Sequence, residues 1–269
     1  MADGGGSGDR TKTQVAMNPS QRNANPNRVD RSGPTVSRTD RRLASDLPGC
    51  LVATIRSNRT ATALVATVAT AFGALAVLAI ASEATLLQFD RAVQNWLLES
   101  RTEWLNQTMV WLTFLGTRYA IALLALGLLL WSWITKKHRA FVLIIIAAAI
   151  LNPIFEIAFK ELIDRVRPAT DQLLPGNGPS FPSGHVLAAV GFYGLIPLLA
   201  WEVTRSVRVR LAALFGSWTV VAVVAVSRPY LDVHWATDAI AGVLLGTVLV
   251  VTAYQAYLGL PQRQQAPAG

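Results

Sequence analysis

Six long apolar stretches constrain this chain more than any other feature of its sequence. A bilayer core about 30 Å thick requires about 20 apolar residues in a helix. Stretches such as 141–147 have no polar face, which is typical of helices surrounded by lipid or by other helices. The sequence therefore predicts an all-α, polytopic membrane protein with six transmembrane helices, at about 61–82, 118–135, 140–159, 185–201, 209–226 and 236–257.

Charged residues are scarce and unevenly distributed. Only 15% of the chain is charged and 52% is hydrophobic, whereas soluble domains carry about 25% charged residues. Residues 1–60 hold ten Lys or Arg and five Asp or Glu, so most of the net charge of +8 lies ahead of the apolar body. This distribution fits a membrane surface and argues against a nucleic-acid partner. The single cysteine, Cys50, excludes a disulfide framework and a cysteine-based metal site.

Composition divides the chain into three parts. Residues 1–56 are rich in Gly, Ser, Asn, Pro and Arg, and we expect them to form a disordered basic tail. Residues 57–260 contain the apolar stretches and form the predicted six-helix membrane domain, and residues 261–269 form a short second tail.

Basic residues near the short loops predict the orientation in the membrane. Arg56, Lys136 and Arg205 all fall on one side if six helices follow a cytoplasmic N-terminus. Cytoplasmic loops are enriched in Lys and Arg. We therefore expect both termini in the cytoplasm, with residues 160–184 and 227–234 at the outer face.

The segment 83–117 is only partly apolar. Charged residues interrupt it, but apolar residues recur at helical spacing, at Leu86, Phe89, Val93, Trp96 and Leu97. This pattern predicts an amphipathic helical region along the membrane interface, between the first and second transmembrane helices.

The first group of unusual polar residues follows the third apolar stretch. Lys160 and Arg167 are seven residues apart, so on a continuous helix they would project from one face, about 10 Å apart along the axis. Two such cations could clamp an anion. They could also be interfacial cations that snorkel to the membrane surface, with Glu156, Glu161 and Asp164 as partners.

The second group, Pro182-Ser183-Gly184-His185, directly precedes the fourth apolar stretch. Ser183 is suited to cap the helix, and Gly184 allows a ligand to approach the backbone. The free N–H groups of a helix start favour a phosphate, beside which His185 would stand. The alternative is an ordinary cap followed by an interfacial histidine.

The third group, Ser227-Arg228 with His234 and Asp238, surrounds the start of the sixth stretch. Residues four apart share a helical face, so Asp238 could accept the Nδ1–H of His234 and leave Nε2 as a nucleophile. A solvent-facing pair is the alternative, although an acid at that depth is costly without a partner. Asp238 is the only acid that we expect in the site.

Together these groups indicate phosphate-ester chemistry. Three cations, two histidines, one acid and a hydroxyl fall at the outer ends of the predicted helices. Because no acidic cluster accompanies them, we expect neither a metal nor a cofactor.

The pattern Lys160-x6-Arg167-Pro168, Pro182-Ser183-Gly184-His185 and Ser227-Arg228-x5-His234-x3-Asp238 resembles the three-part signature of the type 2 phosphatidic acid phosphatase superfamily, which also includes vanadium haloperoxidases. The resemblance implies a six-helix membrane phosphatase. It implies that His234 attacks phosphorus, Asp238 orients it and His185 transfers the proton. It further implies that the phosphate is bound by Lys160, Arg167, Ser183, Gly184 and Arg228.

The expected reaction is dephosphorylation of a membrane lipid. Phosphatidic acid, phosphatidylglycerol phosphate and undecaprenyl diphosphate all remain open as substrates. A non-enzymatic lipid-phosphate binder or transporter is one alternative, but binding alone would need only the cations. A soluble vanadium haloperoxidase is another, and the six apolar stretches argue against it.

Overall fold

The computed structural model describes residues 53, 56–81, 83–168 and 170–261. The predicted tails, 1–56 and 261–269, lie outside the described residues apart from Ala53, Arg56 and Pro261.

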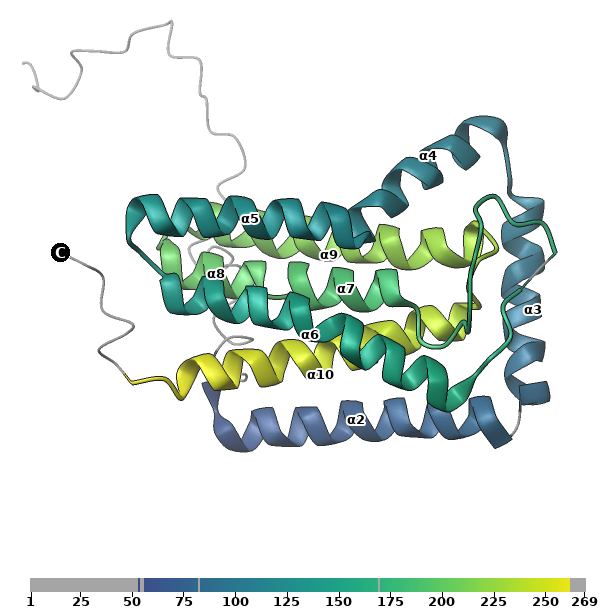
Figure 1. The fold of residues 1–269 in the computed structure, drawn as a ribbon, viewed down its shortest axis with the longest axis horizontal. Helices are drawn as coiled ribbons and strands as arrows, with labels where there is room; N and C mark the ends of the chain where they lie inside the picture. Colours follow the sequence, from purple (N-terminus) through teal and green to yellow (C-terminus); the bar gives the residue numbers. More distant parts are fainter. Residues whose placement is uncertain (1–52, 54–55, 82, 169, 262–269) are drawn as a thin grey trace, which may run out of the picture. The chain divides into compact units, whose positions relative to one another are not determined.

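Six helical segments in the described residues are long and apolar enough to cross a membrane, which confirms the predicted fold class. The spans lie side by side in Figure 1. They are α2 (Asn58–Ala81), α5 (Arg118–Thr135), α6 (Arg139–Ile163), α7 (Gly184–Tyr193) with α8 (Ile196–Val203), α9 (Val207–Tyr230) and α10 (Ala236–Leu258).

The fourth span is two helices rather than the single helix that we expected. A turn at Gly194 and Leu195 separates α7 from α8, and Pro197 lies in the first turn of α8. Proline has no N–H group to donate to the residue four positions earlier, Tyr193, so one regular helix cannot run through this point.

The segment between the first two spans forms α3 (Glu83–Glu99), α4 (Glu103–Thr113) and the short 3₁₀ helix η2 (Phe114–Gly116). Figure 1 shows α3 running across one end of the bundle and α4 leading back from it toward α5. We call this the site end. It is the end where α5, α7 and α10 begin and where α2, α6 and α9 finish.

The buried face of α3 differs from the predicted one. Phe89 and Trp96 are 51% and 67% exposed, whereas Asp90 and Gln94 are buried together with Leu97. The helical spacing was therefore predicted correctly, but the stripe that faces the protein includes an acid and an amide.

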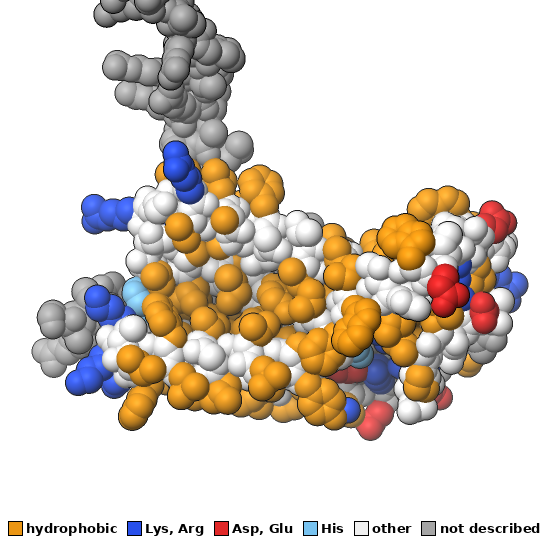
Figure 2. All heavy atoms as spheres, turned by 90° about the horizontal axis from the view of Figure 1, so that it is seen from above, with side chains coloured by type: hydrophobic (Ala, Val, Ile, Leu, Met, Phe, Trp, Pro, Cys, Tyr) orange, Lys and Arg blue, Asp and Glu red, His pale blue; other side chains and the backbone are white. Residues whose placement is uncertain are grey.

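Helices α7 and α10 form the centre of the bundle. Gly242 and Gly246 of α10 face α7, where a Cβ atom on Gly246 would come within 2.6 Å of Val190. Small residues of this kind let membrane helices approach closely. Large apolar side chains such as Leu123, Ile134 and Ile150 point outward instead, as is typical of a surface that faces lipid. Figure 2 shows such side chains over much of one face of the bundle.

Candidate active site

The three sequence groups meet at the site end. Residues 164–183 connect α6 to α7 there, and residues 231–235 connect α9 to α10. The two connections are joined by backbone hydrogen bonds, such as the one from Leu173 N–H to the Leu231 carbonyl at 3.1 Å.

Arg167 reaches the site from a loop and not from a helix. Helix α6 ends at Ile163, because Asp164 adopts the left-handed region with φ of 45°. Our expectation that Lys160 and Arg167 share a helical face was therefore wrong. The guanidinium of Arg167 is held by backbone carbonyls, donating to Gly178 at 2.8 Å and to Asn177 at 3.1 Å.

His234 lies at the centre of the cluster and is almost fully buried. Its Nε2 is 3.0 Å from Nη1 of Arg167, and its Nδ1 is 3.5 Å from Oδ2 of Asp238. A guanidinium can only donate a hydrogen bond and an ionised carboxylate can only accept one. A proton on Nδ1 would face the carboxylate and leave the lone pair on Nε2 facing the guanidinium, and Nδ1 makes no hydrogen bond within the described residues.

The pairing of His234 with Asp238 arises differently from the way we expected. Helix α10 begins at Ala236, so His234 precedes it and the two residues do not share a helical face. Asp238 lies in the first turn, and its Oδ2 also accepts the backbone N–H of Trp235 at 2.9 Å. The carboxylate thus caps its own helix while facing the imidazole.

The surroundings of His234 keep the ring neutral. Burial and the positive charges of Arg228, Arg167 and Lys160 hold the pKa of His234 well below its usual value. Burial also lowers the pKa of Arg167, although a guanidinium stays protonated at neutral pH. The site therefore combines a neutral imidazole with positive charge.

Ser183 occupies the N-cap position of α7, but its hydroxyl does not cap the helix. The Oγ atom is buried and makes no hydrogen bond within the described residues, while the backbone N–H donates to the Asp238 carbonyl at 3.0 Å. The expected capping bond is thus wrong, and the hydroxyl is left for a ligand. Gly184 follows, where a Cβ atom would overlap the carboxylate of Glu156.

Glu156 is a second acid in the site, so our expectation that Asp238 is the only one was wrong. Its carboxylate accepts a 2.6 Å hydrogen bond from Nζ of Lys160. This pairing agrees with the alternative interpretation, in which Glu156 is a partner of Lys160. Both side chains line a cavity that His185 and Gly184 also line. The carboxylate therefore neutralises Lys160 at the place where we expected an anion.

Arg228 is buried at the end of α9, with its side chain held by Thr113 from the end of α4. Nη1 donates to the Thr113 hydroxyl at 2.8 Å, and Nε makes no hydrogen bond within the described part of the chain. Part of the guanidinium is thus left for a ligand.

Asp90 and Arg165 are buried partners of the site that sequence reasoning missed. Arg165 donates to Asp238 and to Asp90 at 2.7 Å each, and Asp90 also accepts from the Thr237 hydroxyl at 2.6 Å. The spacing of Asp90 could have indicated its burial, because it shares one face of α3 with Leu86 and Leu97.

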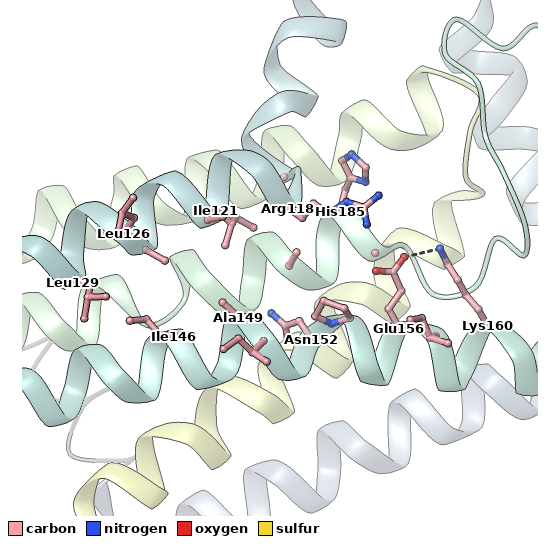
Figure 3. Close-up of a pocket in the computed structure, with 18 residues that line it drawn as sticks. Arg118, Ile121, Leu126, Leu129, Ile146, Ala149, Asn152, Glu156, Lys160 and His185 are labelled. Atoms are coloured by element: carbon pink, nitrogen blue, oxygen red, sulfur yellow. Dashed lines mark hydrogen bonds and ion pairs between the residues drawn. The ribbon is translucent and has the colours of Figure 1, made fainter.

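A cavity of about 570 Å³ leads away from the cluster between α5 and α6. Figure 3 shows Arg118, His185, Glu156 and Lys160 at one end of it, with apolar side chains such as Leu129 further along. Within the described residues, no group of three His, Cys, Asp or Glu side chains is placed to hold a metal ion.

A bundle of six membrane-spanning helices with cations around a buried histidine defines the class of an integral membrane protein. Residues 137–260 match the PAP2 superfamily. Over this range, the chain is similar to the phosphatases of that superfamily. The match includes every site residue that we predicted, but not Asp90, Thr113 or Arg118.

One known protein sequence and two crystal structures are similar to parts of the chain. It is 28% identical over 168 residues to phosphatidylglycerophosphatase B of Bacillus subtilis (strain 168), covering 60% of this chain and 79% of the relative. A crystal structure of a transmembrane PAP2 type phosphatidylglycerolphosphate phosphatase from Bacillus subtilis has the same fold, with a TM-score of 0.66 and 23% identity over 74% of this chain and 98% of that one. A crystal structure of Aquifex aeolicus LpxE aligns with a TM-score of 0.48 and 21% identity, over 63% of this chain and 94% of that one.

Proposed function

We propose that this protein removes the phosphate of a membrane lipid through a phosphohistidine on His234. The substrate is a lipid monophosphate or a polyprenyl diphosphate, of the phosphatidic acid, phosphatidylglycerol phosphate or undecaprenyl diphosphate type. The observation that carries the proposal is the distance of 3.0 Å between Nε2 of His234 and Nη1 of Arg167. An anion drawn to the positive charge of that guanidinium would meet the nucleophile.

The first step transfers the phosphoryl group to the protein. Nε2 of His234 attacks phosphorus, the P–N bond forms and the P–O bond to the lipid breaks. His185 gives a proton to the leaving oxygen. Asp238 stabilises the positive charge that develops on His234.

The second step regenerates the histidine. Water attacks phosphorus, the P–N bond breaks and His185 takes the proton from the water. Five groups bind the equatorial oxygens in both steps and stabilise the transition state, namely Lys160, Arg167, Arg228, the Ser183 hydroxyl and the Gly184 backbone. Their cations supply the positive charge, so the steps require neither a metal nor a cofactor.

The lipid tail would occupy the cavity between α5 and α6. Exposed apolar residues such as Leu126 and Ile157 line it, so the tail can remain in an apolar environment while the phosphate reaches the cluster. This arrangement supports a lipid substrate rather than a soluble one.

The orientation expected from the basic residues places both termini in the cytoplasm and the active site at the outer face. Lys136 and Lys137 lie between α5 and α6, and Arg139 begins α6, all at the end of the bundle opposite the site end. Their position supports this orientation.

The test is phosphate release from each of the three lipids by the purified protein in detergent micelles. The wild type should release phosphate from at least one lipid, and acid quenching should trap a phosphoprotein. His234→Ala should do neither. Binding of the lipids without phosphate release would instead support the non-enzymatic alternative.

A further inference from the structure

Arg101 connects the corner between α3 and α4 to both loops of the site end. Its side chain is only 8% exposed. Nε donates to the Tyr230 carbonyl at 3.2 Å, and Nη1 donates to the Asp171 carbonyl at 2.8 Å. Tyr230 is the last residue of α9, and Asp171 lies in the connection from α6 to α7. One guanidinium therefore joins three segments that are distant in sequence and meet at the site end (Figure 1).

The end of α9 is held in place by α3 and α4. Gln94 of α3 donates to the Pro229 carbonyl at 3.0 Å, and the Tyr230 hydroxyl donates to Asn106 of α4 at 2.7 Å. The last carbonyls of a helix have no donor within the helix, and Arg101 supplies one for Tyr230. These contacts give the guanidinium a fixed support that does not involve the loop of Asp171.

The connection from α6 to α7 is attached to this support over a short stretch. Besides the bond from Arg101, the Asp171 N–H donates to Oδ2 of Asp232 at 2.6 Å, and the Leu173 N–H donates to the Leu231 carbonyl. The carboxylate of Asp171 also pairs with Arg101 at 2.9 Å, but its side chain is 73% exposed, and exposed ion pairs contribute little. The bond from Arg101 to the backbone carbonyl is therefore the one that we expect to fix the loop.

The same loop supplies carbonyls that hold Arg167. Nη2 of Arg167 donates to the carbonyls of Asn177 and Pro179 at 3.1 Å each. Nη1 donates to the Val233 carbonyl of the α9–α10 connection and lies 3.0 Å from Nε2 of His234. Arg167 can make both sets of bonds only while the loop lies against the end of α9. The place of this cation beside His234 therefore depends on how the loop is attached.

We infer that Arg101 is a positioning residue for the anion site. It clamps the α6–α7 connection to the end of α9 and thereby keeps Arg167 beside His234, without touching the substrate itself. Arg101 lies outside residues 137–260, which match the superfamily. Its part in the reaction rests on the proposed function, but its effect on anion binding can be measured without turnover.

The test measures vanadate binding to the full chain in detergent by titration calorimetry, with thermal unfolding of the same samples as the measure of stability. Arg101→Gln should weaken vanadate binding about tenfold, the effect of one lost hydrogen bond to a charged group. Arg101→Lys preserves one donor, so its loss should be smaller, and it serves if Arg101→Gln does not fold. Arg91→Gln is the matched control, because Arg91 is an exposed arginine of α3.

A double-mutant cycle with Arg167 distinguishes positioning from general stability. Arg167→Lys retains a cation, so vanadate binding remains measurable, but it lacks the planar group that the loop carbonyls hold. If Arg101 acts through Arg167, adding Arg101→Gln to Arg167→Lys should weaken binding by less than about twofold more, because the effects of coupled residues do not add.

Two results would overturn the inference. Vanadate binding that is unchanged in Arg101→Gln, with a lower unfolding temperature, would make the arginine merely structural. Losses that simply add in the cycle would mean that Arg101 does not act through Arg167. Phosphate release tests the proposed function separately, since a wild type that binds vanadate but hydrolyses none of the three lipids would contradict that function and not the clamp. A wild type that does not bind vanadate would contradict both.

Discussion

Arg165 and Asp238 form a fully buried ion pair, with 2.7 Å between Nη1 of the guanidinium and Oδ1 of the carboxylate. The same guanidinium also pairs with Asp90 at 2.7 Å, so it joins α3 to the carboxylate that faces His234. Asp238 uses its other oxygen toward the imidazole. The orientation of His234 therefore depends, through Asp238 and Arg165, on α3, which lies outside the three sequence groups.

The first prediction concerns this connection. Arg165→Gln should lower kcat about a hundredfold and destabilise the protein, because removing one partner of a buried ion pair costs about 3–5 kcal/mol. Arg165→Lys should not rescue it, since an ammonium group cannot bridge two carboxylates as a planar guanidinium does. Phosphate release and thermal unfolding in detergent provide the measurements.

Arg91→Gln is the control, because Arg91 is exposed on the same helix as Asp90. An Arg165→Gln variant that unfolds more readily but retains its pH profile and kcat would show that the arginine supports only stability. Asp90→Asn should give a smaller loss than Arg165→Gln, because the pair with Asp238 remains.

The second prediction separates the two histidines by the leaving group. A lipid alkoxide needs protonation in the transition state, whereas nitrophenolate leaves without it, and general acid catalysis contributes about 10² to 10⁴-fold. His185→Ala should therefore lose far more rate on a lipid phosphate than on nitrophenyl phosphate. His234→Ala should be nearly inactive on both. Rapid-quench labelling should find phosphoprotein in His185→Ala and none in His234→Ala; label on His185 alone would reverse the assignment.

The third prediction concerns Glu156, whose carboxylate pairs with Lys160 at 2.6 Å. Incoming phosphate must displace it, so Glu156→Gln should bind vanadate or inorganic phosphate several-fold more tightly. Inhibition constants measure the effect. The neighbouring exposed Glu161→Gln should leave them unchanged. Weaker inhibition in Glu156→Gln would mean that the acid holds Lys160 in place for the anion.

The fourth prediction is that activity survives removal of metals. Cations of the protein itself surround the site, and vanadate should inhibit because it mimics five-coordinate phosphorus. Rates measured with and without a chelator such as EDTA should agree within twofold. Activity that is lost in the chelator and returns with added magnesium would contradict the mechanism.

The fifth prediction is the orientation in the membrane. In a Cys50→Ser background, a cysteine at Thr102 near the site end should react with an impermeant thiol reagent in intact cells, and one at Ser206 should not. Both positions are exposed, and neither side chain caps its helix. The reverse labelling pattern would place the active site in the cytoplasm.

The class of fold and the residues of the candidate site could be predicted from local features of the chain. The six spans follow from the length and continuity of the apolar stretches, which are local properties that a bilayer imposes on any chain. Lys160, His185 and His234 could be selected because each stands near the end of an apolar stretch, where a charged or titratable side chain is conspicuous.

The orientation of those residues could not be predicted, because it depends on tertiary contacts. Asp164 ends α6 before Arg167, and the Ser183 hydroxyl makes no hydrogen bond to any residue that the structure describes. Asp90 and Arg165 are far apart in sequence, and their pairing becomes favourable only when both are removed from water in the same place. Sequence periodicity predicts that a segment is helical, but the partner that a buried charge meets depends on which other segments the fold brings to it.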